Sequence, residues 1–346
     1  MTQRKDGTAL RAAGEEARYL RRFKKARSII LVILAASLFV FVLVALFGIL
    51  NEGAGRFVAT LFSINIAYYA LAFAVLFSGY LLRFPKWEYY MKKLKVRIKR
   101  WDNFVVYLSL YSMDITPGRW GRSVVSYTIN KISGVKFAKT FSAVVADIFT
   151  DFLGFAILAL FAAVLLHKYE SVSIVIAAVL LLPFIFLFNR GPFMLIERHF
   201  GHIKRLGGFF SMGHAYFKNN RMLGRNAYVY SMLFTIPSQF INGLALYLVI
   251  LSFGIKMGVA YIPAVLFIYS SSLLLGMITG IPATLGVTDA ALVGYLTIFF
   301  SGLGINIGTA TLITIFFRIV SVWFVEGFGF AAFFYSMRYW KRASPA

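Results

Sequence analysis

The sequence predicts an all-α, polytopic integral membrane protein: a helical bundle of six to eight spans, with two re-entrant or broken segments in an inverted repeat. Of its 346 residues, 60% are hydrophobic and only 14% are charged, whereas a soluble chain is about 25% charged. Apolar stretches long enough to cross a bilayer recur along the chain. This composition excludes a soluble enzyme, a disordered chain and a disulfide-stabilised secreted domain.

The 36 Lys and Arg residues, against 13 Asp and Glu, give a net charge of +23. They gather in runs that flank the apolar stretches, as the positive-inside rule describes, and such runs attract anionic headgroups. We therefore expect membrane lipids, anionic or phosphate-bearing, as partners and no nucleic acid. The chain has no Cys, which excludes disulfides and cysteine metal sites. No metal or other cofactor is expected.

Full spans are expected wherever about twenty predominantly apolar residues follow one another. In chain order these spans are 28–50, 57–82, 141–167, 171–189, 226–253 and 305–337. A basic segment, 1–27, precedes them and a short tail, 338–346, follows. The membrane domain is therefore expected to cover 28–337.

Segment 83–103 carries eight Lys or Arg residues with Trp and Tyr interleaved. This mixture is typical of a helix lying at the cytoplasmic interface, with its cations toward lipid phosphates, although a basic loop that only sets the topology fits equally well. The next segment, 104–115, is apolar but too short to cross a bilayer, which indicates a re-entrant segment.

Two further apolar segments, 259–278 and 287–300, flank a break at 280–286. They form either one re-entrant hairpin or two spans, so the total is six spans with two re-entrant segments, or eight spans. In both cases the basic segments fall on one side of the membrane. These segments are 1–27, 83–103, 116–140, 190–225 and the tail. We expect a plasma-membrane protein with both termini in the cytoplasm.

Ionisable residues inside predicted spans mark the candidate site, because a charge at the bilayer centre costs about 2.5–3.5 kcal/mol on insertion scales. They are Asp147, Asp151, Asp289, Arg318 and Glu326, with Asp114 as a sixth if its short segment enters the bilayer. Asp147 and Asp151 are four residues apart and so share a helical face. Arg318 is expected within reach of Asp147, Asp151 or Asp289. The alternative is that these groups only pair with one another and fix helix packing.

Two helix breaks share the pattern Pro-x-x-x-Gly, and each is expected to be a non-helical turn buried at membrane depth. The turn residues are Pro117, Gly118 and Gly121 in the first break and Pro282 and Gly286 in the second. Each break precedes a helix with an intramembrane charge. Paired interruptions point to a transporter site at a repeat interface, with repeat halves at about 57–189 and 226–337.

The polar segment 190–225 offers a weaker candidate. Glu197, His199 and His202 have ligand-like spacing, but Gly201 interrupts the helix, so no metal site is predicted. The sequence contains no phosphate-binding loop, zinc-protease motif or nucleophile elbow. We therefore expect no enzyme.

Both breaks resemble signatures of the lysylphosphatidylglycerol synthase transmembrane (flippase-like) family. The first signature is Thr116-Pro117-Gly118-Arg119-Trp120-Gly121, followed about thirty residues later by Asp147 and Asp151. The second is Ile281-Pro282-Ala283-Thr284-Leu285-Gly286-Val287-Thr288-Asp289-Ala290-Ala291-Leu292, with Arg318 on the next helix. Ala283 and Thr284 stand where the family usually has two glycines, and Asp289 replaces its Glu.

The resemblance implies lipid translocation. Because the sequence stops at Ala346, the soluble aminoacyl-transfer domain of the two-domain synthases is not expected. Arg119 and Arg318 would attract a headgroup phosphate, and the intramembrane acids would hold those arginines, bind a headgroup amine or carry a coupling proton. The runner-up is a lipid-modifying membrane enzyme, with Glu197 and His199 as its acid–base pair, or a non-transporting membrane partner.

Overall fold

The structure is a computed structural model that describes residues 53–166, 190–200, 223–281, 284 and 286–342, with isolated positions between 39 and 50 and at 214 and 217. These ranges contain helices and no strand, which confirms the all-α prediction. Within them five helical stretches are long and apolar enough to cross a membrane: Ile66–Lys93, Phe137–Leu165, Arg225–Ser252, Val259–Thr279 and Ile307–Arg338. The predicted span 171–189 and most of 28–50 lie outside the described residues.

In chain order the helices of the first half are α2 (Ala54–Phe62), α3 (Ile66–Leu82), α4 (Phe84–Lys93), α5 (Arg100–Ser109), η1 (Leu110–Met113), η2 (Pro117–Ser123), α6 (Val124–Ser133) and α7 (Phe137–Leu165). Those of the second half are α9 (Arg190–Phe200), α11 (Arg225–Ser252), η4 (Val259–Tyr261), α12 (Ile262–Thr279), α13 (Val287–Phe300), η6 (Ser301–Leu303), α14 (Ile307–Arg318), η7 (Ile319–Trp323) and α15 (Phe324–Arg342).

The predicted span 57–82 is not one helix, because the chain breaks between α2 and α3. Asn65 ends the break: its side-chain Oδ1 accepts hydrogen bonds from the backbone N–H groups of Ala67 and Tyr68, at 3.0 and 3.3 Å. This is an N-cap, which satisfies donors that the first helical turn leaves free. The Asn65 N–H also donates to the carbonyl of Ser252 (2.7 Å), at the end of α11. An apolar pattern alone does not reveal such a cap.

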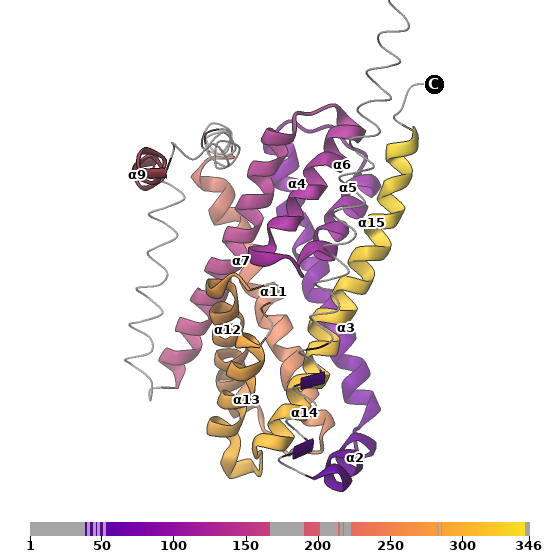
Figure 1. Ribbon diagram of the computed structural model, residues 1–346, viewed down its shortest axis with the longest axis vertical. Helices are drawn as coiled ribbons and strands as arrows, with labels where there is room; N and C mark the ends of the chain where they lie inside the picture. Colours follow the sequence, from indigo (N-terminus) through magenta and orange to yellow (C-terminus); the bar gives the residue numbers. More distant parts are fainter. Residues whose placement is uncertain are drawn as a thin grey trace, which may run out of the picture.

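α3 and α11 run side by side in opposite directions and pack closely along their length (Figure 1). Gly79 permits this close approach, since a Cβ there would overlap the side chain of Asn242. Small residues at helix interfaces are the usual means by which membrane helices pack closely.

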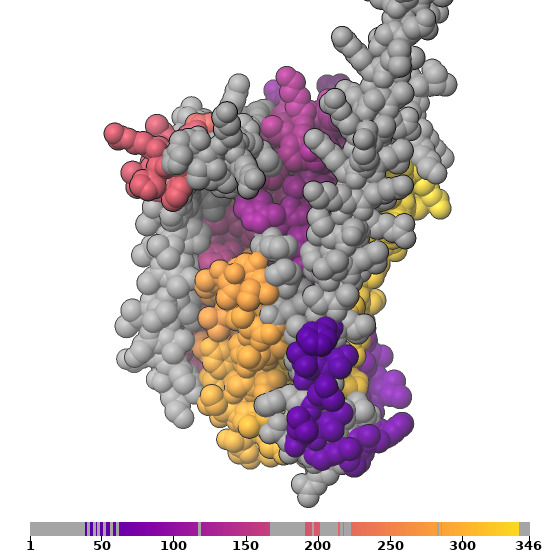
Figure 2. All heavy atoms as spheres, viewed as in Figure 1, coloured from indigo at the N-terminus to yellow at the C-terminus, as the bar shows by residue number. Residues whose placement is uncertain are grey.

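Two helical hairpins face one another at their tips. The first, α5–η1–η2–α6, has its open side at the end of the bundle where α15 ends, and the second, α12–α13, has its open side at the opposite end (Figure 1). The side chains of the second hairpin form an outer face of the lower half in the space-filling view (Figure 2). Each hairpin packs against the helix that follows the other: α12 packs on α7, and α5 with η1 packs on α15.

The first break is a 3₁₀-helix, η2, and the prediction of a non-helical turn there is wrong. The Arg119 N–H donates to the carbonyl of Thr116 (2.9 Å), a bond of 3₁₀ type. The Gly121 N–H donates to the Thr116 hydroxyl (2.7 Å) and closes the segment. Arg119 itself adopts a left-handed φ of 59°. In the second break Thr284 and Gly286 are described, and Pro282 lies outside the described residues.

Candidate functional site

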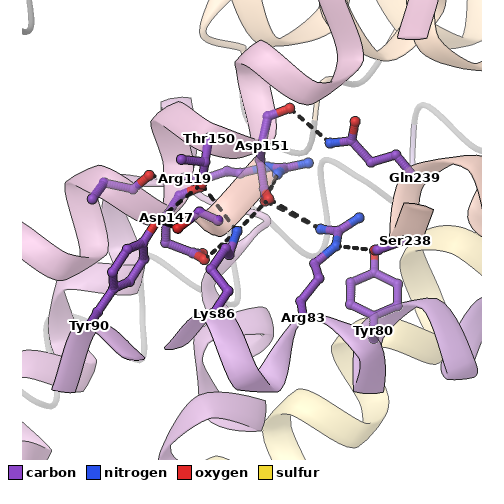
Figure 3. A network of polar contacts seen from close by, with 12 residues as sticks. Tyr80, Arg83, Lys86, Tyr90, Arg119, Asp147, Thr150, Asp151, Ser238 and Gln239 are labelled. Atoms are coloured by element: carbon purple, nitrogen blue, oxygen red, sulfur yellow. Dashed lines mark hydrogen bonds and ion pairs between the residues drawn. The ribbon is translucent and has the colours of Figure 1, made fainter. Parts of the chain in front are cut away.

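The site begins with two acids on α7. Asp147 and Asp151 are one helical turn apart, and both are buried, with 1% and 0% of their surface exposed. They share a helical face, as their spacing predicts, and that face points to the bundle interior, as expected for charges within a span. Figure 3 shows cations reaching them from α4 and from the first hairpin.

Two of these cations come from the junction of α3 and α4. Lys86 Nζ lies 2.8 Å from Asp147 Oδ1 and 3.2 Å from Asp151 Oδ1, and Arg83 Nη1 lies 3.4 Å from Asp151 (Figure 3). The interpretation of 83–103 as a helix with its cations toward lipid phosphates is therefore wrong for this part, because Arg83 and Lys86 are buried in the bundle.

Their position follows from helical periodicity. Arg83, Lys86, Trp87 and Tyr90 occupy positions i, i+3, i+4 and i+7, which form one face of a helix, and all four are buried. Because the segment contains eight basic residues, its sequence indicates a solvent-exposed helix or loop rather than this buried face.

Arg122 joins the two α7 acids to the tip of the first hairpin. Its Nε and Nη2 lie 2.5 and 2.7 Å from the two carboxylate oxygens of Asp114, and its Nη1 lies 2.6 Å from Asp147 and 3.4 Å from Asp151. The guanidinium is fully buried and lies over the Tyr111 ring. The prediction that the cations of 116–140 lie in the cytoplasm is therefore wrong for Arg122, which is buried in the bundle.

Arg119 is held more loosely. Its Nη1 lies 3.2 Å from Asp151 and its Nε 3.8 Å from Asp114, and 16% of its side chain is exposed. We call the cations Arg83, Lys86, Arg119 and Arg122 with the acids Asp114, Asp147 and Asp151 the first charge network.

Arg318 and Asp289 form a second ion pair, with Arg318 Nε 2.6 Å from Asp289 Oδ1. This confirms that Arg318 lies within reach of one of the three acids considered. Asp289 is held in place because its Oδ2 accepts a hydrogen bond (2.9 Å) from the N–H of Gly286, just before α13. Arg318 and Asp289 are 4% and 5% exposed, so the pair is buried.

An apolar cavity of about 430 Å³ lies between the two hairpin tips. Its walls come from α7, α12 and both tips: Asp114, Thr116, Arg119, Trp120, Val145, Ile148, Phe149, Phe152, Gly276, Met277, Gly280, Ile281 and Thr284. A smaller, charged cavity of about 60 Å³ adjoins it and contains Arg83, Arg318 and Glu326. The two cavities share Asp114, Arg119 and Thr284. The six predicted ionisable site residues and Arg119 thus lie in or around one polar interior, next to an apolar chamber.

The pair considered for an enzyme, Glu197 and His199, is not the contact that the structure forms. Glu197 Oε2 lies 2.9 Å from Nε2 of His214, and the His214 side chain is 57% exposed. His199 stacks edge-on against Phe200, and His202 lies outside the described residues. This pair lies at the protein surface, whereas the charges of the candidate site are buried.

Comparison with known proteins agrees with this picture. No curated protein matches the chain. Residues 29–329 match the sequence profile described as the lysylphosphatidylglycerol synthase TM region, which together with the apolar helices makes this a multi-pass integral membrane protein. The match spans well over half of the 346 residues, and the chain therefore belongs to the lysylphosphatidylglycerol synthase TM region family.

Proposed function

We propose that the protein moves a phosphate-bearing membrane lipid across the bilayer, through the space between the two hairpin tips. The observation that carries this proposal is the pair of adjoining cavities, one apolar and one charged, that share Arg119. A lipid has the same two-part character. The apolar cavity suits acyl-chain methylenes, and the arginines of the charged cavity suit a phosphate, which guanidinium groups bind in a bidentate manner.

Arg119 is the residue that we assign to the headgroup. Arg122 already saturates Asp114 with two short bonds, whereas the contacts of Arg119 are 3.2 and 3.8 Å long and its side chain is partly exposed. A phosphate entering the charged cavity can therefore recruit Arg119 without breaking a short ion pair.

Movement across the bilayer requires a way to open the site to either side, and an inverted repeat would provide it. Three features support such a repeat: the hairpins enter from opposite ends, each packs on the helix that follows the other, and their tips share a local geometry. In both Pro-x-x-x-Gly motifs the third residue has a left-handed φ, 59° for Arg119 and 56° for Thr284. In both motifs the N–H of this third residue donates a hydrogen bond to the carbonyl of the residue before the proline, at 2.9 and 3.0 Å.

Transbilayer movement in liposomes tests the proposal. Phosphatidylglycerol with a fluorescent acyl chain is incorporated with the purified protein, and external dithionite destroys only the fluorescence of the outer leaflet. We expect wild-type protein to increase the fraction destroyed. Arg119→Gln should slow this by roughly ten- to a hundredfold, because a hydrogen bond to a charged group contributes about 1.5–3 kcal/mol.

Arg100→Gln is the matched control, because the Arg100 side chain is 78% exposed and lies outside both cavities. Equal rates for the two variants at equal reconstituted amounts would contradict the assignment of Arg119, and wild-type liposomes that behave like empty ones would contradict lipid movement. Mass spectrometry of the recovered lipid distinguishes the runner-up, since a lipid-modifying enzyme would change the lipid mass.

We also propose that the protein lies in the cell membrane with both termini in the cytoplasm. The support is that α4, α6 and the last turn of α15 lie at one end of the bundle, and the α13–α14 turn at the other (Figure 1). The Cys-free chain allows a direct test. An impermeant maleimide added to intact cells should label Gly302→Cys and should label Lys131→Cys only after permeabilisation. The reverse pattern would contradict the orientation.

A further inference from the structure

The helix that carries Arg318 contains a π-helical turn, η7, before α15 begins. Glu326 follows Arg318 by eight residues, and in a regular α-helix such a pair would be about 80° apart around the axis. A π turn accommodates one extra residue and so rotates the following residues back by about 100°. The π turn therefore brings Glu326 onto the face of Arg318, and both residues line the charged cavity.

Glu326 differs from the other acids of the interior. It is 4% exposed, and its Oε2 has no hydrogen-bond partner among the described residues. Asp114, Asp147, Asp151 and Asp289 each form at least one ion pair, whereas no ion pair is formed by Glu326 within the described part of the chain.

The charges that face this carboxyl group come from several elements. The titratable and charged side chains that line its cavity are Tyr80, Arg83, Asp114, Arg119, Tyr269 and Arg318. Of the elements packed on α15, α5 carries the buried Tyr107, Asp102 and the exposed Arg100. η1 places the Tyr111 ring against Phe328, and α6 contributes Lys131, which is exposed. Glu326 therefore shares its cavity with three arginines and one other acid.

A charge count shows what Glu326 balances. The first charge network has four cations and three acids, a formal excess of +1, and Arg318 with Asp289 is neutral. Ionised Glu326 brings the described interior to zero, and protonated Glu326 leaves +1. An uncompensated buried charge costs several kcal/mol. A phosphodiester, with one negative charge, could replace the Glu326 carboxylate in this balance.

We propose that Glu326 and the substrate phosphate neutralise the same cations in turn, so that phosphate binding is coupled to the uptake of one proton by Glu326. The proton comes from water, adds to a Glu326 carboxylate oxygen as the phosphate enters, and returns to water when the phosphate leaves. The identity of the phosphate as a lipid headgroup rests on the proposed function, whereas the coupling itself rests on the cavity and its charges.

Calorimetry on the purified full chain tests this coupling. Dihexanoyl phosphatidylglycerol is titrated between pH 5 and pH 9 in pairs of buffers with different ionisation enthalpies, which reveals the protons taken up per lipid bound. We expect about one proton at the alkaline end, with an affinity that falls about tenfold per pH unit there. Glu326→Gln mimics the protonated acid, and should bind without proton uptake and with an affinity independent of pH.

Glu88→Gln is the matched control, because Glu88 lies on α4, pairs with Lys92 and Arg100, and lines neither cavity. It should behave as the wild type. Binding by wild type without proton uptake at any pH overturns the proposal, as does full proton uptake by Glu326→Gln, or the absence of lipid binding. If Glu326→Gln does not fold, the wild-type measurement alone decides.

A second titration, with inorganic phosphate, separates the two possible sources of the anion. Inorganic phosphate itself titrates in this pH range, so the proton uptake that counts is the part that Glu326→Gln abolishes. Binding of inorganic phosphate with the same affinity as the lipid and with such a Glu326-dependent proton uptake would support the coupling and overturn the proposed function. Proton-coupled binding of the lipid alone supports both. Failure of the liposome assay with proton-coupled lipid binding intact would overturn lipid movement and leave the role of Glu326 supported.

Discussion

Replacing Arg122 with glutamine would remove a side chain that contacts three acids at once: Asp114, Asp147 and Asp151. Asp114 would lose both of its short bonds and keep only the contact of 3.8 Å to Arg119 Nε. Breaking a buried ion pair from one side costs about 3–5 kcal/mol. The three contacts share one guanidinium, so their contributions are not additive, and we expect about 3–5 kcal/mol in total.

This loss would lower the ratio of folded to unfolded protein by roughly a hundred- to several-thousandfold. It can be measured by titrating the purified protein in mild detergent with sodium dodecyl sulfate while following tryptophan fluorescence, to which the buried Trp87 contributes. Arg122→Lys should lose less, since it keeps the charge and loses the bidentate geometry.

The control for this experiment is Arg100→Gln. Arg100 forms an exposed pair with Glu88 at 3.5 Å, and such pairs contribute about 0–1 kcal/mol. If Arg122→Gln loses no more stability than Arg100→Gln, the first charge network does not hold the fold together and the reasoning from burial is refuted.

Two other substitutions test the packing and the second ion pair. Gly329→Ala should lose about 1–3 kcal/mol in the same titration, because the added Cβ would overlap the backbone of η1. Gly327→Ala adds a methyl group to open space and should lose none, since alanine is the better helix former. Equal losses for the two variants would argue against the packing of α15 on the first hairpin. Arg318→Leu should lower the amount of folded protein, since it leaves Asp289 buried without its cation. Adding Asp289→Asn should restore that amount and adding Asp151→Asn should not; the opposite result would place Arg318 with Asp151.

Much of the architecture is predictable because membrane physics leaves few options. In the bilayer the backbone must satisfy its own hydrogen bonds, so apolar length alone predicts most of the described helices. The spacing of Asp147 and Asp151 likewise fixes a shared face, and both are buried as expected. The cost of a buried arginine predicts an acid beside Arg318, which is Asp289.

The cations that pair with the α7 acids are harder to predict, because their sequence context indicates exposure at the membrane surface rather than burial. Arg83 and Lys86 stand in a segment with eight basic residues, where a positive-inside count treats every cation as exposed. Arg122 follows a proline–glycine turn that could equally have been a surface loop. The stripe that Arg83 and Lys86 form with Trp87 and Tyr90 is the signal that would have separated inward from outward cations.

The breaks between helices depend on individual hydrogen bonds rather than on composition. Asn65 stops a hydrophobic run by capping α3, and Thr116 turns the first break into a short helix through two bonds. In each break the hydrogen bonds of one polar residue determine the local structure, whereas many other polar residues in apolar runs do not interrupt a helix. The positions of such breaks therefore follow only from the folded geometry.

The distribution of ion pairs has a consequence for how the protein is made. In the described chain every buried ion pair joins residues of one half, 83–151 or 289–318. The bonds that α11 forms with the first charge network use neutral side chains, Ser238 and Gln239. As the ribosome delivers the chain from its N-terminus, each of these ion pairs can form within its own half, and only the single excess positive charge of the first charge network has to wait for Glu326 of the second half.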